Sequence, residues 1–345
     1  MEDILDNQNV IDQRDPFGAL KAAAGEWELL TAEYEISGEF ETRDVANVVV
    51  AGMGGSALAA ELLLDWLKLD VPFEIVKNYD LPAYVGENTL VIASSFSGNT
   101  EETLSAFDQA LEKKAAVVTV ASGGKLLDLA ADKHVPYIKQ PTYLQPRMAV
   151  FGGLIGMLTF LEAYGLTKGK ASEVRDAADW LRTESERWEA TVPTEYNLAK
   201  QLAVHAAGKT PVIYGASNIH SLVYKWKISF NENAKNVAFC NVLPEFNHNE
   251  FIGWSSHPVE KPFAVFDLRS DHEHPRVSKR FEVTDRLLSG MRPKSQVVEI
   301  EGESVIRELL WGSVLADFTT IYVAILNGVE PSKVDLVEKM KTELG

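Results

Sequence analysis

Cysteine is almost missing from this chain of 345 residues, which contains only Cys240. A single cysteine excludes an intrachain disulfide and favours a reducing compartment such as the cytoplasm. The first sixteen residues are polar and acidic, and they lack the cationic and apolar regions of a signal peptide. The sequence therefore predicts a cytoplasmic protein.

Positive charge is also scarce, because 33 lysines and arginines stand against 50 acidic residues and give a formal net charge of −17. Such a balance argues against a nucleic acid as the main partner. It leaves a small phosphate possible as a ligand, because local amides and a few cations decide that binding.

Long apolar runs are lacking as well. No segment has the roughly 18 uninterrupted apolar residues that a membrane span needs. The longest candidate, residues 148–166, contains four glycines and Glu162 and is more typical of a core helix. We expect no membrane partner.

The chain does contain a regular alternation of apolar strand-like segments with helical segments. NVVVAGMG (47–54) precedes a helical pattern, and TLVIASSFSGNT (89–100) precedes another. Strands that alternate with helices of about 10–15 residues predict an α/β fold with mainly parallel sheets and helices on both faces. Each domain would then have three layers, αβα.

This pattern occurs twice. The segment 210–235 repeats the order of the segment that begins at residue 47: an apolar strand, a glycine, a serine two or three positions later, and a helix. A charged helical stretch separates the two halves. We predict one domain over residues 1–168, a connecting helix over 169–196 and a second domain over 197–345.

The turn GMGGSA (52–57) joins a strand to a helix. Glycines allow a sharp turn there, and the exposed amides of the helix N-terminus favour an anion. The turn is neither a dinucleotide fingerprint, because residue 57 is alanine, nor a Walker loop, because it lacks G-K-[ST]. A plain tight turn remains the alternative.

A second junction of the same kind is SSFSGNTEE (94–102). Ser95, Ser97 and Thr100 can present hydroxyls, and Gly98 leaves room for a ligand. Asn99 or Thr100 could instead cap the helix, but a cap needs only one side chain. Two hydroxyl-rich junctions after nearby strands favour a phosphate pocket.

Three charged residues are candidates for chemistry. Arg147, between a proline-containing loop and an apolar helix, could stabilise an anion, although a lone arginine there is more often solvated. Glu232, near a helix end rich in aromatic residues, could be a half-buried general base. His248, in the aromatic and turn-rich segment 238–258, suits proton transfer in a functional loop. Each alone is more often an ordinary surface residue.

His248, Glu250 and His257 could also be metal ligands. Their spacing matches no usual zinc pattern and no cysteine supports it, so we expect no metal.

Together, GMGGSA, SSFSGNTEET, the Pro-Arg before a helix, NENAK and PEFNHNE resemble the bifunctional phosphoglucose/phosphomannose isomerases of the sugar isomerase (SIS) domain superfamily. The resemblance extends from about Asp15 to the C-terminal helix. It implies two SIS-type subdomains and an aldose–ketose isomerase. Such an enzyme interconverts glucose 6-phosphate or mannose 6-phosphate with fructose 6-phosphate by proton transfer through a cis-enediol.

The resemblance also implies which residues bind the substrate phosphate. The sugar 6-phosphate would be held by hydroxyls and amides of Gly55, Ser56, Ser95, Ser97 and Thr100.

Roles in catalysis follow from the same resemblance. Glu232 would move a proton between C2 and C1, and Arg147 would stabilise the enediolate. His248 would assist ring opening from the other subunit of a homodimer. NGVEPSK places Lys333 where phosphoglucose isomerases use a lysine in G-V-E-x-x-K. The implied reaction uses no redox cofactor and no metal, and the implied partners are a 6-phosphosugar and a second copy of the chain.

Two alternatives are another SIS enzyme, such as an aminotransferring hexosephosphate isomerase, and a non-catalytic sugar-phosphate sensor. The first would normally carry a glutaminase domain and the second a helix-turn-helix module. We expect neither here.

Overall fold

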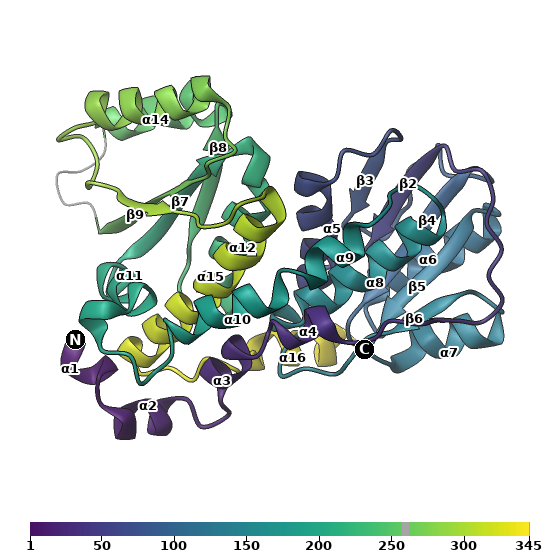
Figure 1. The fold of residues 1–345 in the computed structure, drawn as a ribbon, viewed down its shortest axis with the longest axis horizontal. Coiled ribbons are helices and arrows are strands. Elements are labelled where there is room, and N and C mark those ends of the chain that lie inside the picture. Colours follow the sequence, from purple (N-terminus) through teal and green to yellow (C-terminus); the bar gives the residue numbers. More distant parts are fainter. Residues whose placement is uncertain (257–261, 345) are drawn as a thin grey trace. The chain divides into compact units, whose positions relative to one another are not determined.

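The computed structural model describes residues 1–256 and 262–344 and divides the chain into two compact units (Figure 1). The first unit is Gly25–Trp180, and the second joins Met1–Ala24 to Leu181–Gly345. Each unit has its own mainly parallel sheet flanked by helices, which confirms the predicted α/β fold class.

The sheet of the first unit has six strands in the order β1-β6-β5-β4-β2-β3, and only β1 runs antiparallel to its neighbour. Strands β4 and β5 are buried along their whole length, as expected for a parallel sheet covered on both faces. The strands are β1 (Ile36–Ser37), β2 (Asn47–Ala51), β3 (Phe73–Val76), β4 (Thr89–Ser95), β5 (Ala116–Ala121) and β6 (Tyr137–Lys139).

Helices cover the two faces of this sheet. Phe107 and Leu126, from α6 and α7, pack with Val117 on one face. Val120, three residues further along β5, points to the other face of the sheet. Helix α8 lies close to this face, because a Cβ on Gly156 would be 2.7 Å from Val120 Cγ1. The helices are α4 (Glu28–Thr31), α5 (Gly54–Trp66), α6 (Glu101–Glu112), α7 (Gly124–Asp132), α8 (Val150–Ala163) and α9 (Lys170–Arg175).

The sheet of the second unit has four parallel strands in the order β10-β9-β7-β8. On one face, the rings of His205 and Trp226 contact Phe266. On the other face, Phe281 packs with Val265. The elements are α11 (Leu198–Ala206), β7 (Thr210–Ala216), α12 (His220–Glu232), β8 (Phe239–Leu243), α13 (Glu250–Gly253), β9 (Phe263–Arg269), α14 (Pro275–Leu287), β10 (Gln296–Glu299), α15 (Val305–Asn327) and α16 (Asp335–Leu344).

Helix α15 is the core helix of the second unit. Within residues 1–256 and 262–344 it alone is long and apolar enough to cross a membrane, but 94% of its most apolar window is buried inside the structure. It packs closely on α12, where Trp226 Nε1 donates a hydrogen bond to the carbonyl of Gly312 at 3.0 Å. Burial against protein therefore accounts for its apolar composition.

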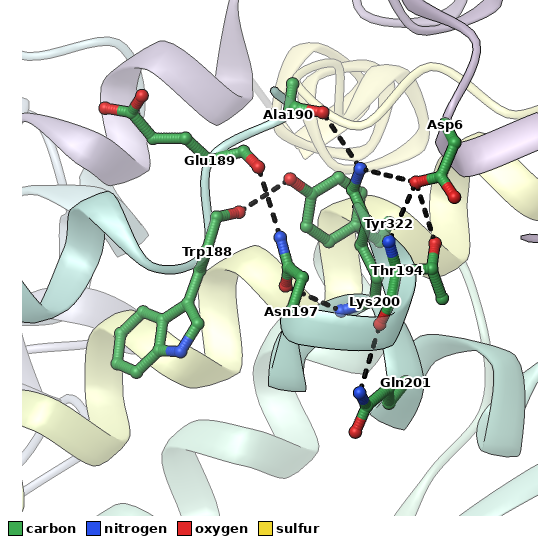
Figure 2. Close-up of polar contacts among 9 residues, drawn as sticks. All are labelled: Asp6, Trp188, Glu189, Ala190, Thr194, Asn197, Lys200, Gln201 and Tyr322. Carbon is green, nitrogen blue, oxygen red and sulfur yellow. Dashed lines mark hydrogen bonds and ion pairs between the residues drawn. The ribbon is translucent and has the colours of Figure 1, made fainter. Parts of the chain in front are cut away.

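Residues 1–24 pack in the second unit, although the predicted first domain, residues 1–168, includes them. Figure 2 shows the contact that holds them. Lys200 Nζ, on a side chain that is fully buried, donates to Asp6 Oδ1 at 3.1 Å and to the carbonyl of Ala190 at 2.9 Å. Burial lowers the pKa of Lys200, and the hydrogen bond to Asp6 opposes that effect. Because a buried ammonium needs such partners, this contact fixes the segment between α1 (Glu2–Leu5) and α2 (Gln8–Arg14).

Two further expectations differ from the structure. The predicted connecting helix over 169–196 is replaced by two short helices, α9 and α10 (Ala178–Glu186), and the border between the units falls within α10. The segment 238–258, expected to be irregular, begins with strand β8. This strand lies at the sheet edge and, in the described part of the chain, pairs only with β7. Because only one of its five residues is buried, its sequence has no regular apolar pattern.

Candidate active site

The two glycine- and hydroxyl-rich junctions lie at the switch point of the first sheet. The chain continues from β2 to β3 on one side and then crosses to β4 on the other side. The loops that leave β2 and β4 therefore diverge, and ligands of open α/β sheets bind at the carboxyl ends of such strands. Residues 52–57 and 94–102 occupy these two positions.

Ser56 connects the two junctions. It lies in the first turn of α5, and its hydroxyl accepts a hydrogen bond from the backbone N–H of Phe96 at 3.0 Å. The turn before it also approaches β4, because a Cβ on Gly52 would lie only 2.8 Å from the carbonyl oxygen of Ser94. Only glycine fits at this position.

The hydroxyls at the end of β4 and in the loop after it make hydrogen bonds within the loop. Ser95 Oγ lies 2.8 Å from Thr100 Oγ1 and accepts from the N–H of Gly98 at 3.1 Å. Ser97 Oγ accepts from the N–H of Asn99 at 3.3 Å, and its side chain is exposed. Thr100 occupies the N-cap position of α6 without making a capping bond. Helix capping by its side chain therefore does not explain this threonine.

Gly98 brings a third loop into the site. Its φ is +70°, and a Cβ there would lie 1.8 Å from the carbonyl oxygen of Gly123, in the loop after β5. This loop was not among the predicted site segments, although its Gly-Gly pair at a strand end was a usable signal.

Arg147 lies beside the first junction. A Cβ on Gly55 would come within 2.6 Å of the Pro146 carbonyl oxygen and 3.2 Å of Arg147 Cα, so the short 3₁₀ helix Pro146–Met148 touches the turn. The arginine is only 1% exposed, and its Nη1 donates to Gln145 Oε1 at 3.4 Å. It is therefore not the solvated arginine of the alternative interpretation.

Glu232 and Lys333 lie on neighbouring segments of the second unit. Glu232 is the last residue of α12 and is half-buried. Lys235 Nζ donates to the backbone carbonyl of Glu232 at 2.9 Å and to that of Pro331 at 3.0 Å. These two bonds join the end of α12 to the segment NGVEPSK (327–333). The Lys333 ammonium lies 4.9 Å from the centre of the Phe17 ring. The linking role of Lys235 was missed at the sequence level, because nothing local indicates contact with a segment about 96 residues away.

His248 lies on the opposite face of the second sheet from Glu232. Phe246, two residues before it, packs with the residues of α14 on one face, and Asn247 Nδ2 donates to Thr284 Oγ1 on that helix at 2.9 Å. Glu232 belongs to α12, which contacts the other face. The two residues therefore belong to elements that pack on opposite faces of the second sheet.

The alternative metal ligands are only partly described. His257 lies outside the described residues. Glu250 accepts hydrogen bonds from the Tyr214 hydroxyl and, at 2.8 Å, from Asn241 Nδ2, so it anchors its loop to the sheet. Across residues 1–256 and 262–344, no group of three or more His, Cys, Asp or Glu side chains is arranged to hold a metal ion.

Sequence comparisons identify close relatives. Residues 195–344 match the family described as the bacterial phospho-glucose isomerase C-terminal SIS domain. The bifunctional phosphoglucose/phosphomannose isomerase of Caldicellulosiruptor bescii is 34% identical over 313 residues, which cover 90% of this chain and 92% of the relative. The enzyme of that name from Thermoplasma acidophilum is 33% identical, with coverage of 92% and 96%.

A structural comparison agrees with the fold. The crystal structure of a glucose-6-phosphate isomerase like protein from Thermus thermophilus has a TM-score of 0.66 to this chain, and the match covers 97% of this chain and 98% of that one. The sequence identity is 18%, so this likeness shows a shared SIS-type fold.

Proposed function

Because the chain belongs to the family of bifunctional phosphoglucose/phosphomannose isomerases, we propose that it interconverts glucose 6-phosphate or mannose 6-phosphate with fructose 6-phosphate. The observation that carries the proposal is the pair of hydroxyl-rich junctions at the switch point of the first sheet. Purified protein should form fructose 6-phosphate from both aldoses without added metal. Absence of turnover with both would reject the proposal.

The substrate phosphate is held at these junctions. Gly55 and Ser56 open α5, and Ser95, Ser97 and Thr100 precede or begin α6, so hydroxyls and helix N-terminal amides face the same anion. Both helices exceed ten residues, and their dipoles favour a phosphate at this end.

Glu232 and Arg147 carry the proton transfer. The Glu232 carboxylate takes the proton from C2, which leaves an enediolate across C1 and C2 with the charge on O1. A proton then moves from O2 to O1, and Glu232 returns its own proton to C1, which gives the ketose. Arg147 stabilises the negative charge of that intermediate, and its burial beside Gly55 supports this role. Glucose and mannose 6-phosphates are epimers at C2 and share one enediol, so the same base serves both.

Ring opening is assigned to His248 of a second copy of the chain. The separation of His248 and Glu232 by the second sheet supports a homodimer in which each site uses residues of both copies. Lys333 is assigned to the same active site, because Lys235 joins its segment to the end of α12 that carries Glu232. We also place the enzyme in the cytoplasm, as expected from the single cysteine.

Removing two of the hydroxyls assigned to the substrate phosphate tests the position of the phosphate site. Ser97→Ala combined with Thr100→Ala should raise KM by about 100-fold or more and change kcat little, because each of the two lost hydrogen bonds to a charged group contributes about 1.5–3 kcal/mol and about 1.4 kcal/mol corresponds to a tenfold change. The control is Ser105→Ala, one turn into α6, whose hydroxyl accepts from Gln109 instead. Unchanged affinity for inorganic phosphate would show that the pocket lies elsewhere.

Mixing two inactive variants tests the shared site. Glu232→Gln and His248→Ala homodimers should both be inactive, whereas heterodimers retain one intact site. After equal amounts are dissociated and reassociated, about a quarter of the wild-type activity should return if a C2 dimer shares its sites. No recovery in a mixture proven to contain heterodimers would contradict the shared site.

A further inference from the structure

Three side chains, two on one face of α12 and one on the residue that directly follows this helix, converge on a single buried carboxylate of α15. Lys225 Nζ donates to Asp317 Oδ2 at 2.5 Å, and Ser229 Oγ donates to Asp317 Oδ1 at 3.0 Å. Asn233 Nδ2 reaches the same Oδ1 at 3.2 Å. The donors are spaced four residues apart, so they lie on one side of the helix. None of the four residues is more than 1% exposed.

Stability alone is a weak explanation for this arrangement. Moving an ammonium and a carboxylate out of water costs several kcal/mol each, and apolar pairs of similar volume often stabilise a core equally well. Hydrogen bonds are directional, so unlike apolar contacts they fix the rotation and the axial position of one helix relative to another. In α12 the bonded face runs from Lys225 to the residue that follows the helix, Asn233.

The last of these bonds acts next to Glu232. Asn233 directly follows Glu232, and its Nδ2 also donates to Thr320 Oγ1 on α15 at 2.9 Å. We propose that Asp317 is a positioning residue of the isomerase, which fixes the last turn of α12 and thereby the Glu232 carboxylate. This inference rests on the proposed function, in which Glu232 is the base. A misplacement of about 1 Å can cost about 100-fold in rate.

The substitution Asp317→Asn tests the inference, because it keeps the shape of the side chain and removes the charge. We expect kcat to fall by about 10- to 100-fold, whereas KM and the affinity for inorganic phosphate stay within about twofold, since the first unit provides the phosphate-binding groups. The control is Glu308→Gln, a fully buried carboxylate on the same helix that accepts from Ser270 Oγ and the N–H of Asp271. This control should keep the wild-type kcat.

A milder variant covers the case in which Asp317→Asn does not fold. Asn233→Ala leaves the Lys225–Asp317 pair intact and removes only the link beside Glu232; it should lower kcat by about fivefold or more with KM unchanged. If folded Asp317→Asn, or folded Asn233→Ala, retains kcat within about threefold of wild type while Glu232→Gln is inactive, the positioning role is wrong and the proposed function stands. If the wild-type chain itself does not isomerise, the proposed function has failed instead.

Discussion

Glu232→Gln should abolish the isomerisation of both sugar phosphates while leaving their binding intact. Glutamine has the size of glutamate, but its amide cannot take the proton from C2. General-base catalysis contributes about 10²- to 10⁴-fold, so kcat should fall by about three orders of magnitude. Substrate affinity should change little, because the groups assigned to the phosphate are in the first unit.

The experiment measures kcat and, separately, equilibrium binding of glucose 6-phosphate. Glu282→Gln is the control, because this exposed glutamate on α14 pairs with Lys279 and has no assigned role. If Glu232→Gln retained more than about a tenth of the wild-type kcat, another residue would have to be the base.

Gly98→Ala should disrupt the loop after β4, which we assign to the substrate phosphate, and destabilise the first unit. The new Cβ would lie 1.8 Å from the Gly123 carbonyl oxygen, which is a backbone atom, so the backbone of one of the two loops has to shift. The positive φ adds about 1–2 kcal/mol and the forced repacking about 1–3 kcal/mol, so we expect a loss of about 2–5 kcal/mol in the free energy of unfolding. KM should rise as well, because Ser95 and Ser97 move with the loop.

Gly165→Ala separates the cost of the positive φ from the cost of the contact with Gly123. Gly165 has nearly the same φ, +71°, but a Cβ there would have no heavy atom of the described residues within 4 Å, so only the backbone cost applies. Denaturant unfolding and KM are measured for both variants. Gly98→Ala should cost clearly more stability than Gly165→Ala and alone should raise KM; equal losses with unchanged KM would show that the contact with Gly123 is unimportant.

The two glycine- and hydroxyl-rich junctions at one edge of the first sheet could be predicted because their signal is local. Glycine at Gly52 and Gly55 and hydroxyls at Ser95 and Thr100 stand directly after apolar strands, and parallel strands bring their carboxyl ends to one sheet edge. The position of Arg147 was not predictable in this way. It reaches Gly55 through a short 3₁₀ helix whose location depends on the packing of α8 rather than on a repeating pattern.

The other differences between the sequence predictions and the structure also come from contacts between residues that are distant in the sequence. Asp6 meets Lys200 across 194 positions of sequence, so the early residues carry no local sign that they belong to the second unit. Strand β8 lies at an edge and only Leu243 in it is fully buried, so neither alternation nor a continuous apolar run marked it. Glu232 and His248 were both proposed from their residue type, whereas their positions on elements that pack on opposite faces of the second sheet depend on topology.

The most direct test of the proposed proton transfer is the reaction in deuterium oxide. Glucose 6-phosphate and mannose 6-phosphate are each converted in D₂O, and the products are examined for deuterium. Because a carboxylate base exchanges its proton with solvent, deuterium should enter C1 of fructose 6-phosphate and C2 of the aldoses formed in the reverse reaction. Complete retention of the original hydrogen after many turnovers at equilibrium, with no deuterium at C1 or C2, would contradict a transfer through the enediol by Glu232.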